Sequence, residues 1–330
     1  MEKIKVGIAG IGAISQVAYL PSLQEIEDFN VIAVCDVDYQ KAEAVARKYG
    51  ISHIFDDYED FLRNADIDTV VIATPNYLHF PMLMGALDYG RDVICELPLC
   101  LRENEIEEIK SSVSKNKKIL FPAMNGRFRP DARVLHRTIT SGEIGNVIYS
   151  KAGWLKSLKK KVQSWRSRKS ESGGGAIMTL GTYVLDYMIW ALQKKVSTVF
   201  ASLHRDDEVE DSGIVLMKFE DGTFGTFEVS WTILFEKDFT YFNVYGNRGT
   251  AIMNPMKIEK LYQGEILDLT PREPIKHPFM NSYKFMLEHF RDIKRGRAQQ
   301  LYTHEDANYI LKIILASYRS FETGAEERIP

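Results

Sequence analysis

A glycine-rich turn between a strand and a helix is the first feature of this sequence that could bind a ligand. The β-rich run IKVGIA at residues 4–9 is followed at once by GIGAIS, with Ser15 at its end, and then by a helix-compatible stretch. In such a turn Gly10 permits the tight bend, Gly12 lets backbone N–H groups approach a pyrophosphate, and the helix N-terminus favours negative charge. The fingerprint has Gly or Ala where this chain has Ser15. We predict dinucleotide binding by Gly10, Gly12, Ala13 and Ile14.

The second predicted strand ends in a carboxylate that fits the same ligand. Asp36 directly follows the apolar run at residues 31–35, 24 residues after the second glycine of the turn. A carboxylate at that point can accept hydrogen bonds from both hydroxyls of the adenosine ribose. Val37 and Asp38 offer no cation for a 2′-phosphate, so the sequence favours NAD over NADP. The alternative, that Asp36 only caps the helix beginning near Tyr39, stays open.

The elements around these residues alternate in type over the first 122 residues. We expect further strands at 53–55, 69–73, 92–96 and 118–122, and helices at 40–49, 58–64, 80–89 and 103–114. This alternation implies right-handed βαβ units and a parallel sheet with helices on both faces. Ligands of such sheets lie beyond the C-terminal strand ends, where Gly10, Asp36, Thr74 and Glu96 fall.

The rest of the chain follows a different pattern. After a helix at 175–192 we expect strands at 198–203, 213–219, 223–231, 240–245 and 250–253, and two final helices at 281–294 and 305–321. Adjacent strands with short turns favour a mostly antiparallel sheet. We therefore predict an α/β protein with two domains, a Rossmann doubly wound sheet at 1–122 and an α+β domain with an open sheet at 123–330.

Composition and charge exclude some classes of protein. The chain has 330 residues, 45% hydrophobic and 26% charged, and a formal net charge of −3, which gives no reason to expect binding to nucleic acid or membranes. The three cysteines have no metal-ligand spacing, so no metal site is predicted. No uncharged run approaches the roughly 20 residues of a membrane span, and the N-terminus leaves no room for a signal peptide. We expect a reduced, cytoplasmic protein.

The sequence resembles the Gfo/Idh/MocA oxidoreductases, named for glucose-fructose oxidoreductase and inositol dehydrogenase, nearly from end to end. The resemblance implies a Rossmann domain and an α/β domain whose open sheet commonly forms the subunit interface, hence a homodimer or homotetramer. It also implies reversible hydride transfer between NAD(P) and the carbinol carbon of a sugar, polyol or related alcohol. The motifs that carry it are VGIAGIGAIS at 6–15, VIATPNYLH at 71–79, VICELPLC at 93–100, SGEIG at 141–145, SGGGAIMTLGTYVLDYMIW at 172–190 and FEDGTFGTFEVSW at 219–231.

The catalytic residues of the family are replaced in this sequence. The usual strand-end motif is Glu-Lys-Pro, in which the lysine contacts the reacting oxygen, whereas this chain has Leu97 between Glu96 and Pro98. In the helix after the triple glycine the family usually has Asp and, four residues later, His as the acid/base. The corresponding residues here are Thr179 and Tyr183.

Tyr183 is our candidate for the acid/base. Positions 179, 183 and 186 share one face of the predicted helix, so their side chains can converge on one ligand. A phenol can take the hydroxyl proton of a carbinol if its pKa falls from about 10 toward neutrality. Thr179 would then be a hydrogen-bonding relay. Tyr183 could equally be a buried tyrosine that fills the space of the histidine.

A basic run before that helix could supply the missing cation. No acidic residue interrupts it, and in the resembling family this segment borders the substrate and nicotinamide pocket. Lys156 and Arg166 are therefore candidate ligands of an anionic substrate, such as a sugar phosphate, sugar acid or nucleotide-linked sugar. A solvated surface is the alternative interpretation. The run comprises Lys151, Lys156, Lys159, Lys160, Lys161, Arg166, Arg168 and Lys169.

The resemblance also implies further ligand-binding positions. Arg127, together with Tyr183, is assigned to the substrate. For Trp165 core packing is as plausible as a ligand contact, and for His79 a structural role is the more usual one. The remaining predicted cofactor contacts are Thr74, Pro75, Asn76, His79, Glu96, Leu97, Asn125, Trp165 and Arg166.

Three functions are compatible with these residues. The first is an NAD-dependent oxidoreductase acting on a carbohydrate-like alcohol, with Tyr183 in place of the usual histidine. The second is a non-catalytic dinucleotide-binding protein, a sensor or a partner subunit, which kept the cofactor site and lost the chemistry. The third is an enzyme that reduces an activated double bond and needs little acid/base help.

Overall fold

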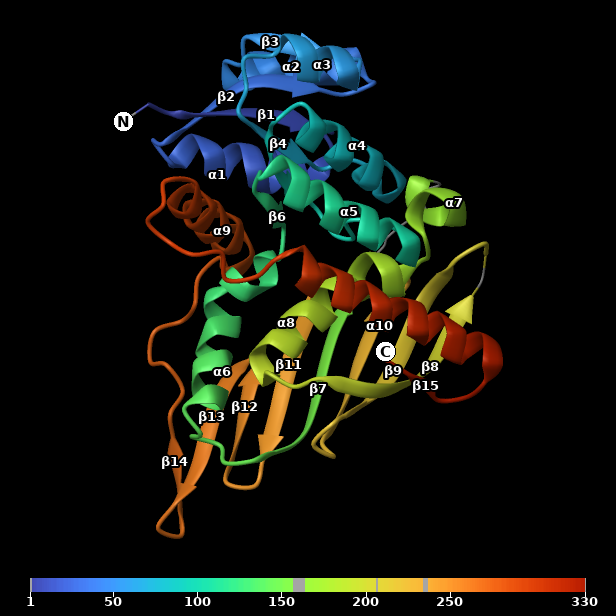
Figure 1. Ribbon diagram of the computed structural model, residues 1–330. Coiled ribbons are helices and arrows are strands. Elements are labelled where there is room, and N and C mark those ends of the chain that lie inside the picture. Colours follow the sequence, from blue (N-terminus) through green and yellow to red (C-terminus); the bar gives the residue numbers. More distant parts are fainter. Residues whose placement is uncertain (1, 157–163, 206, 234–236, 330) are drawn as a thin grey trace. The chain divides into compact units, whose positions relative to one another are not determined.

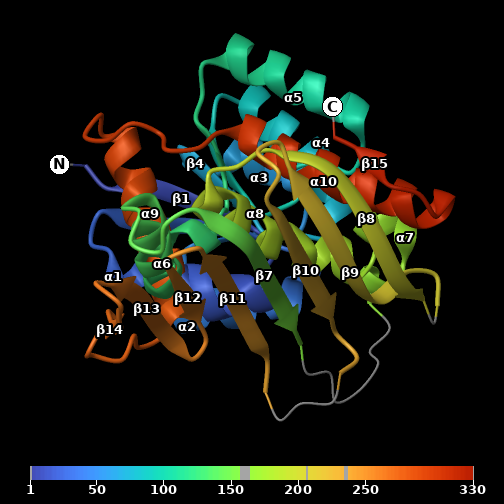
Figure 2. The same cartoon turned by 90° about the horizontal axis from the view of Figure 1, so that it is seen from below.

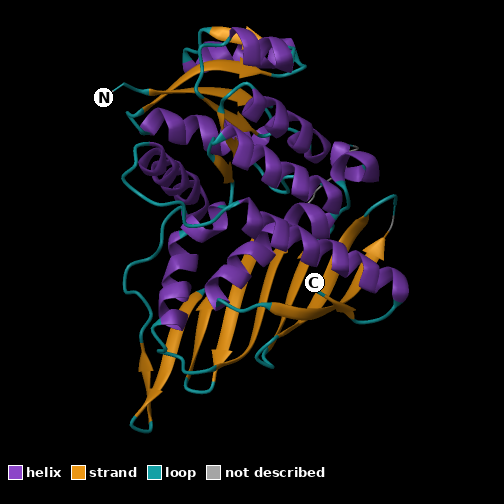
Figure 3. Ribbon diagram, in the orientation of Figure 1, coloured by secondary structure: helices purple, strands orange, loops and turns teal. Residues whose placement is uncertain are grey.

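The computed structural model describes residues 2–156, 164–205, 207–233 and 237–329 (Figure 1). It divides into two compact units, residues 1–125 with 279–308 and residues 126–278 with 309–330. Lys159, Lys160 and Lys161 of the basic run lie outside the described residues. Figure 3 shows strands and helices interleaved in the first unit and a broad sheet in the second.

A parallel sheet of six strands forms the centre of the first unit, in the order β3-β2-β1-β4-β5-β6. This is the predicted doubly wound Rossmann sheet, and it is confirmed. The change of direction lies between β1 and β4, where such sheets bind ligands. The strands are β1 (Ile4–Ala9), β2 (Phe29–Cys35), β3 (His53–Phe55), β4 (Thr69–Ile72), β5 (Asp92–Cys95) and β6 (Leu120–Pro122).

Local signals explain most helix boundaries of the first unit. The side chains of Asp38 and Asp57 accept hydrogen bonds from the backbone N–H groups of Lys41 and Asp60, which begins two helices. Gly50 ends the first of these in a left-handed conformation. The helices are α1 (Leu20–Glu25), α2 (Tyr39–Tyr49), α3 (Tyr58–Asn64), α4 (Asn76–Asp88), α5 (Glu103–Asn116) and α9 (Pro278–Lys294).

The second unit contains a nine-stranded sheet in the order β14-β13-β12-β11-β7-β10-β9-β8-β15. Every neighbouring pair is antiparallel except β7 and β10, so the predicted, mostly antiparallel sheet is confirmed. The strands are β7 (Val147–Leu155), β8 (Val196–Arg205), β9 (Glu210–Phe219), β10 (Phe224–Ser230), β11 (Phe239–Gly246), β12 (Gly249–Met253), β13 (Met256–Tyr262), β14 (Glu265–Asp268) and β15 (Glu327–Arg328).

Helices cover one face of this sheet. In Figure 2, α6 (Pro130–Thr140), α8 (Thr182–Leu192) and α10 (His304–Thr323) lie behind the strands, and among the described residues no helix covers the near face. The short helix α7 (Lys169–Ser172) precedes the triple glycine. The stretch Lys169–Leu192 meets the length and hydropathy of a membrane span, which the sequence analysis did not expect. However, 78% of its most apolar window is buried inside the protein, as in a core helix.

Several features differ from the sequence expectations, including α6, β13, β14 and β15, which were not predicted. Helix α4 begins at Asn76 and not near residue 80, although it contains Pro81. Strand β7 was not predicted, although it lies between β11 and β10 in the middle of the sheet. The segment 279–308 belongs to the first unit, whereas the predicted boundary assigned 123–330 to the second. Sequence order alone could not show this, because the apolar face of α9 carries no mark of the sheet against which it packs.

Candidate functional site

The glycine turn of the first unit has the geometry that its sequence predicts. Gly10 has a φ of +88°, and a Cβ there would lie 2.6 Å from the Ala73 carbonyl oxygen, so only glycine fits. The buried Ser15 hydroxyl donates to the Gly10 carbonyl at 2.5 Å. Ser15 therefore ties the helix start to the turn, which explains a serine at the third fingerprint position. A π-helical turn, Ser15–Tyr19, follows directly.

The space around Gly12 fits a bound dinucleotide. A Cβ built on Gly12 would meet no atom within 4 Å, so this glycine is not required by packing within the protein. Ala13, the next residue, is exposed, and Ile14 is half-buried. The first N–H groups of a helix have no acceptor within the helix and bind anions readily. The turn thus offers an open approach to unpaired backbone donors.

Asp36 lies at the end of β2 and is hydrogen-bonded to this turn. Its Oδ2 accepts from the Ile11 N–H at 2.7 Å, and its Oδ1 accepts from the Asp38 N–H at 3.0 Å. Lys41, in the first turn of α2, places its ammonium 2.9 Å from the same Oδ1. This cation was not predicted, because Lys41 lies five residues after Asp36, and only the path of α2 brings its side chain back to that carboxylate.

His79 joins the loop after β4 to the turn after β5. Its buried imidazole lies 2.7 Å from the Pro98 carbonyl oxygen through Nδ1 and 2.9 Å from the Thr74 carbonyl oxygen through Nε2. Burial lowers the pKa of His79, and the two carbonyl groups oppose this. Pro75 caps α4, and Asn76 begins it. His79 therefore has the structural role of holding two predicted cofactor loops together.

Glu96 is buried directly after β5, and its carboxylate accepts hydrogen bonds from two tyrosine hydroxyls. Tyr19 donates to its Oε1 at 2.8 Å and Tyr283, from α9, donates to the same atom at 3.1 Å. The two rings pack edge to face, with centroids 5.1 Å apart. Neither tyrosine was predicted as a site residue, because the residues around Tyr283 give no sign of a partner 187 positions away in the chain. Leu97 beside them is buried and apolar, so position 97 supplies no polar group.

Asn125, another predicted cofactor contact, is buried within the first unit. Its amide Nδ2 donates to the hydroxyl of Ser282 in α9 at 2.9 Å. Ser282 is itself fully buried. This pairing helps to explain why α9 packs with the first unit, and it gives Asn125 a structural contact that the sequence did not indicate.

In the second unit Thr179 and Tyr183 lie on consecutive turns at the start of one helical stretch. Residues Ile177–Gly181 form a π-helical turn, a feature frequent at functional sites, and α8 continues from Thr182. Both side chains are half-buried. The Thr179 hydroxyl donates to the Gly175 carbonyl at 2.8 Å, which leaves its oxygen able to accept. Trp154 of β7 meets the Tyr183 ring edge to face, with centroids 6.4 Å apart.

Arg166 of the basic run interacts electrostatically with Tyr183, and Lys156 interacts with Arg166. Burial lowers the pKa of Arg166, and its electrostatic interaction with Tyr183 opposes this. Burial, followed by the charge of Arg166, lowers the pKa of Lys156, while Asp238 opposes this. Arg166 keeps an exposed face, so it stays charged at neutral pH. Its guanidinium lies 4.4 Å from the centroid of the Trp165 ring.

The other described members of the basic run are separate from this group. Lys151 is exposed in β7, and the exposed Arg168 forms an ion pair with Glu171 at 2.6 Å. Lys169 lies in α7 and lines a different cavity. The described members of the basic run therefore do not form one cluster, and among them Lys156 and Arg166 stay candidates for a ligand.

Arg127 forms a buried ion pair, which the sequence analysis did not predict. Its Nε and Nη2 donate to Asp186 Oδ1 at 2.9 and 2.7 Å, and both side chains are at least nine-tenths buried. Asp186 is the third residue on the predicted face with Thr179 and Tyr183. The pair joins the loop before α6 to α8, so Arg127 has a structural partner besides its proposed substrate role.

We expect Arg127→Met to lower the free energy of unfolding by about 3–5 kcal/mol, because it removes the Arg127 counter-charge from the buried Asp186 carboxylate. The double variant Arg127→Met/Asp186→Leu should recover most of this loss. Chemical denaturation with matched slopes measures both. A loss below about 1 kcal/mol in the single variant would show that the pair contributes little, as exposed pairs do.

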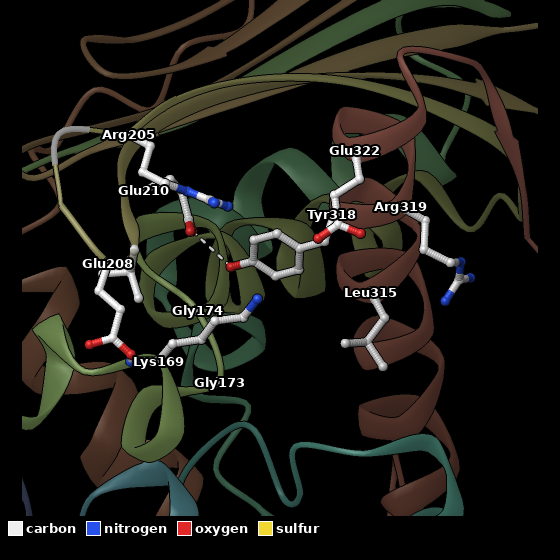
Figure 4. A pocket seen from close by; sticks show the side chains of 11 residues that line it. Lys169, Gly173, Gly174, Arg205, Glu208, Glu210, Leu315, Tyr318, Arg319 and Glu322 are labelled. Atoms are coloured by element: carbon white, nitrogen blue, oxygen red, sulfur yellow. Dashed lines mark hydrogen bonds between the residues drawn. The ribbon is translucent and has the colours of Figure 1, made fainter.

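A small cavity of about 220 Å³ adjoins the triple glycine of the second unit (Figure 4). Tyr318 of α10 donates to Glu210 Oε1 at 2.7 Å, and the same oxygen accepts from the N–H groups of Gly175 and Ile177. Burial raises the pKa of Glu210, and these donors oppose it. A Cβ on Gly175 would lie 1.7 Å from the Glu210 carbonyl oxygen. The glycine run thus lets Glu210 hold the start of the helical stretch that carries Thr179.

Two family models match the chain in the same order as its two units. The model of an oxidoreductase family with an NAD-binding Rossmann fold matches residues 4–124, and the model of the GFO/IDH/MocA C-terminal domain matches residues 132–252. The chain belongs to the Gfo/Idh/MocA oxidoreductase family. Relatives of the chain are named as dehydrogenases and reductases, and the chain is accordingly an NAD(P)-dependent oxidoreductase acting on CH–OH groups.

Relatives with named activities match this chain over most of its length. The D-glucoside 3-dehydrogenase of Escherichia coli (strain K12) is 25% identical, with 97% of this chain and 96% of the relative covered. The 1,5-anhydro-D-fructose reductase of Ensifer adhaerens is also 25% identical, with 91% of each chain covered. A levoglucosan dehydrogenase in complex with NADH and L-sorbose has the same fold, with a TM-score of 0.90, 19% identity and full coverage of both chains.

Proposed function

We propose that this chain is an NAD-dependent dehydrogenase or reductase of a sugar-like substrate that carries a negative charge, with Tyr183 as the acid/base. The observation that carries the proposal is the half-buried Tyr183, which meets Trp154 edge to face and interacts electrostatically with Arg166, itself a neighbouring charge of Lys156. The relatives named for D-glucoside and 1,5-anhydro-D-fructose support a carbohydrate-like substrate.

The residues of the first unit fit a dinucleotide. Gly12 offers open space beside helix N–H groups, and the Asp36 carboxylate can accept from ribose hydroxyls at the adjacent strand end. Glu96, fixed by two tyrosines, is our candidate contact to the nicotinamide ribose. We assign the remaining cofactor contacts to Thr74, Pro75 and Asn76, and from the second unit to Trp165 and Arg166. The bound nicotinamide supplies or accepts the hydride.

Tyr183 moves the proton of the reacting hydroxyl in this proposal. In oxidation the phenolate takes the proton from the substrate oxygen as hydride leaves the carbon, and in reduction the phenol returns it. Arg166, which interacts electrostatically with Tyr183, stabilises the anionic form of the phenol. Thr179 can accept a hydrogen bond while it donates to Gly175. The buried indole N–H of Trp154 has no acceptor among the described residues.

Lys156 and Arg166 should select for the negative charge of the substrate. We expect Lys156→Met and Arg166→Met each to raise the KM for glucuronate or UDP-glucose by about tenfold, the effect of losing one charge-assisted hydrogen bond. The KM for the neutral polyol sorbitol should stay within about twofold of its original value, or sorbitol should be inactive throughout. If only neutral polyols are turned over, the anionic class is wrong.

The pH dependence of this selectivity follows from the lowered pKa of Lys156. The ammonium is present below that pKa and is lost as the pH rises through it, before an ordinary lysine would titrate. We therefore expect the KM for an anionic substrate to rise with pH in the alkaline range and the KM for a neutral one to stay level. Lys156→Arg, whose side chain stays charged, should abolish the difference.

The experiment that tests the function combines NAD or NADH with a panel of sugar acids, sugar phosphates and nucleotide sugars. Turnover is followed by the absorbance of the reduced nicotinamide. Tight binding of NADH without turnover, unchanged by Leu97→Lys, would instead support a non-catalytic dinucleotide-binding protein. Turnover of activated double bonds but of no alcohol would support the reductase alternative.

We also propose that the open face of the second sheet binds a second copy of the chain. The strand register places Phe200 beside Leu216 and Phe224 beside Tyr149, and the Tyr149 ring also stacks on Tyr245. Phe200, Leu216 and Phe224 are exposed. An uncovered row of apolar side chains on a sheet marks an interaction site. Light scattering should give the mass of a dimer or tetramer, and a monomer at micromolar concentration would contradict the proposal.

A further inference from the structure

Lys41 pairs with Asp36, the carboxylate that we assign to the adenosine ribose, where NAD and NADP differ. The two cofactors differ only at the 2′-oxygen of the adenosine ribose, which carries a phosphate in NADP and a hydroxyl in NAD. A carboxylate at the end of β2 accepts a hydrogen bond from that hydroxyl. Lys41 places its ammonium 2.9 Å from Oδ1 of that carboxylate, Asp36. The Asp36 side chain is 8% exposed and that of Lys41 is 37% exposed, so the ion pair is open to a ligand from the lysine side.

The hydrogen bonds of Asp36 decide which of its partners a ligand can displace. The Ile11 and Asp38 N–H groups are fixed by the backbone, whereas the ammonium of Lys41 stands on a flexible chain. Lys41 lies in the first turn of α2, and its backbone N–H donates to the side chain of Asp38. A ribose hydroxyl can therefore take the place of the ammonium on Oδ1 while the rest of the turn is unchanged.

We propose that Lys41 is a residue that determines cofactor specificity, because it cancels part of the charge with which Asp36 repels a 2′-phosphate. This inference rests on the proposed cofactor site of the first unit. With both residues present, NAD is preferred. Without the Asp36 carboxylate, Lys41 is free to bind the 2′-phosphate together with the helix N-terminus of α2, and the preference moves to NADP. Asp38 limits this shift, because its carboxylate stays in place.

Four proteins test the inference by binding alone: the original chain, Asp36→Ser, Lys41→Met and the double variant. Dissociation constants for NADH and NADPH come from isothermal titration at low and high salt. We expect Asp36→Ser to improve NADPH binding about tenfold, and the double variant to lose that gain, in line with one charge-assisted contact. Lys41→Met alone should weaken NADPH binding more than NADH binding. The gain in Asp36→Ser should shrink with salt.

A matched control and a second variant keep the test decisive. Lys48→Met removes the same charge from the exposed last turn of the same helix and should leave both dissociation constants unchanged. Asp36→Asn retains an acceptor for the Ile11 N–H, so it serves if Asp36→Ser loosens the turn. If Asp36→Ser and the double variant bind NADPH equally, Lys41 has no such role. If the original chain binds neither dinucleotide, the proposed function fails first.

Discussion

Tyr183→Phe is expected to lower kcat by about 10²–10⁴-fold, the usual contribution of a positioned general acid or base. The substitution removes one hydroxyl and keeps the ring, whose edge-to-face contact with Trp154 is then preserved. Binding of NADH should not change, because no contact to the dinucleotide is assigned to Tyr183. Steady-state turnover and isothermal titration of the same protein separate the two effects.

Two further variants sharpen this result. Tyr89→Phe, at an exposed tyrosine of the first unit, should retain full activity. Tyr183→His introduces the acid/base that the family usually has, with an ordinary pKa of about 6.5. It should retain activity and move toward neutrality the alkaline limb of the pH profile for reduction and the acid limb of that for oxidation. Activity of Tyr183→Phe within about twofold of the original would exclude Tyr183 as the acid/base and leave it as a packing residue.

Gly12→Ala is expected to weaken dinucleotide binding by about 1–3 kcal/mol, the cost of an extra group in a close contact, which is roughly 5- to 150-fold. The fold should not suffer, because the added Cβ meets no atom within 4 Å in the protein itself. Fewer unfolded conformations should even raise the free energy of unfolding slightly. Titration with NADH and thermal unfolding without it measure the two quantities.

Gly10→Ala provides the contrast in the same turn. Its φ of +88° and the 2.6 Å approach of a Cβ to the Ala73 oxygen predict a loss of stability as well as of binding. The opposite outcome for Gly12, a destabilised protein that still binds NADH tightly, would mean that the open space beside this residue does not receive the cofactor.

The local sequence was enough for the elements of the first unit. Strand β1, the glycine turn and Asp36 were predicted together, because a positive φ, a buried apolar run and a strand-end carboxylate are each written in a few adjacent residues. The same is true of helix α3 and strand β3, whose predicted bounds are those observed. That Leu97, Thr179 and Tyr183 replace the usual catalytic residues of the family stays a prediction.

Strand β7 shows where local pattern failed. Its sequence, VIYSKAGWL, mixes Lys and Gly with apolar residues, because one side of the strand lies on the open face of the sheet and Gly153 admits the Tyr241 ring. The strand is held by β10 and β11, which lie more than 65 residues later in the chain. Its identity as a central strand is therefore a property of its partners.

The tertiary structure alone decided which polar groups meet. The pairs of Glu96 with Tyr283 and of Arg127 with Asp186 join residues 187 and 59 positions apart. The ion pair of Asp36 and Lys41 spans only five residues, yet it depends on how α2 leaves the end of β2. A residue's type and spacing determine which chemistry it can do, whereas burial and charge neighbours, which set its protonation and its partner, arise only when distant segments pack.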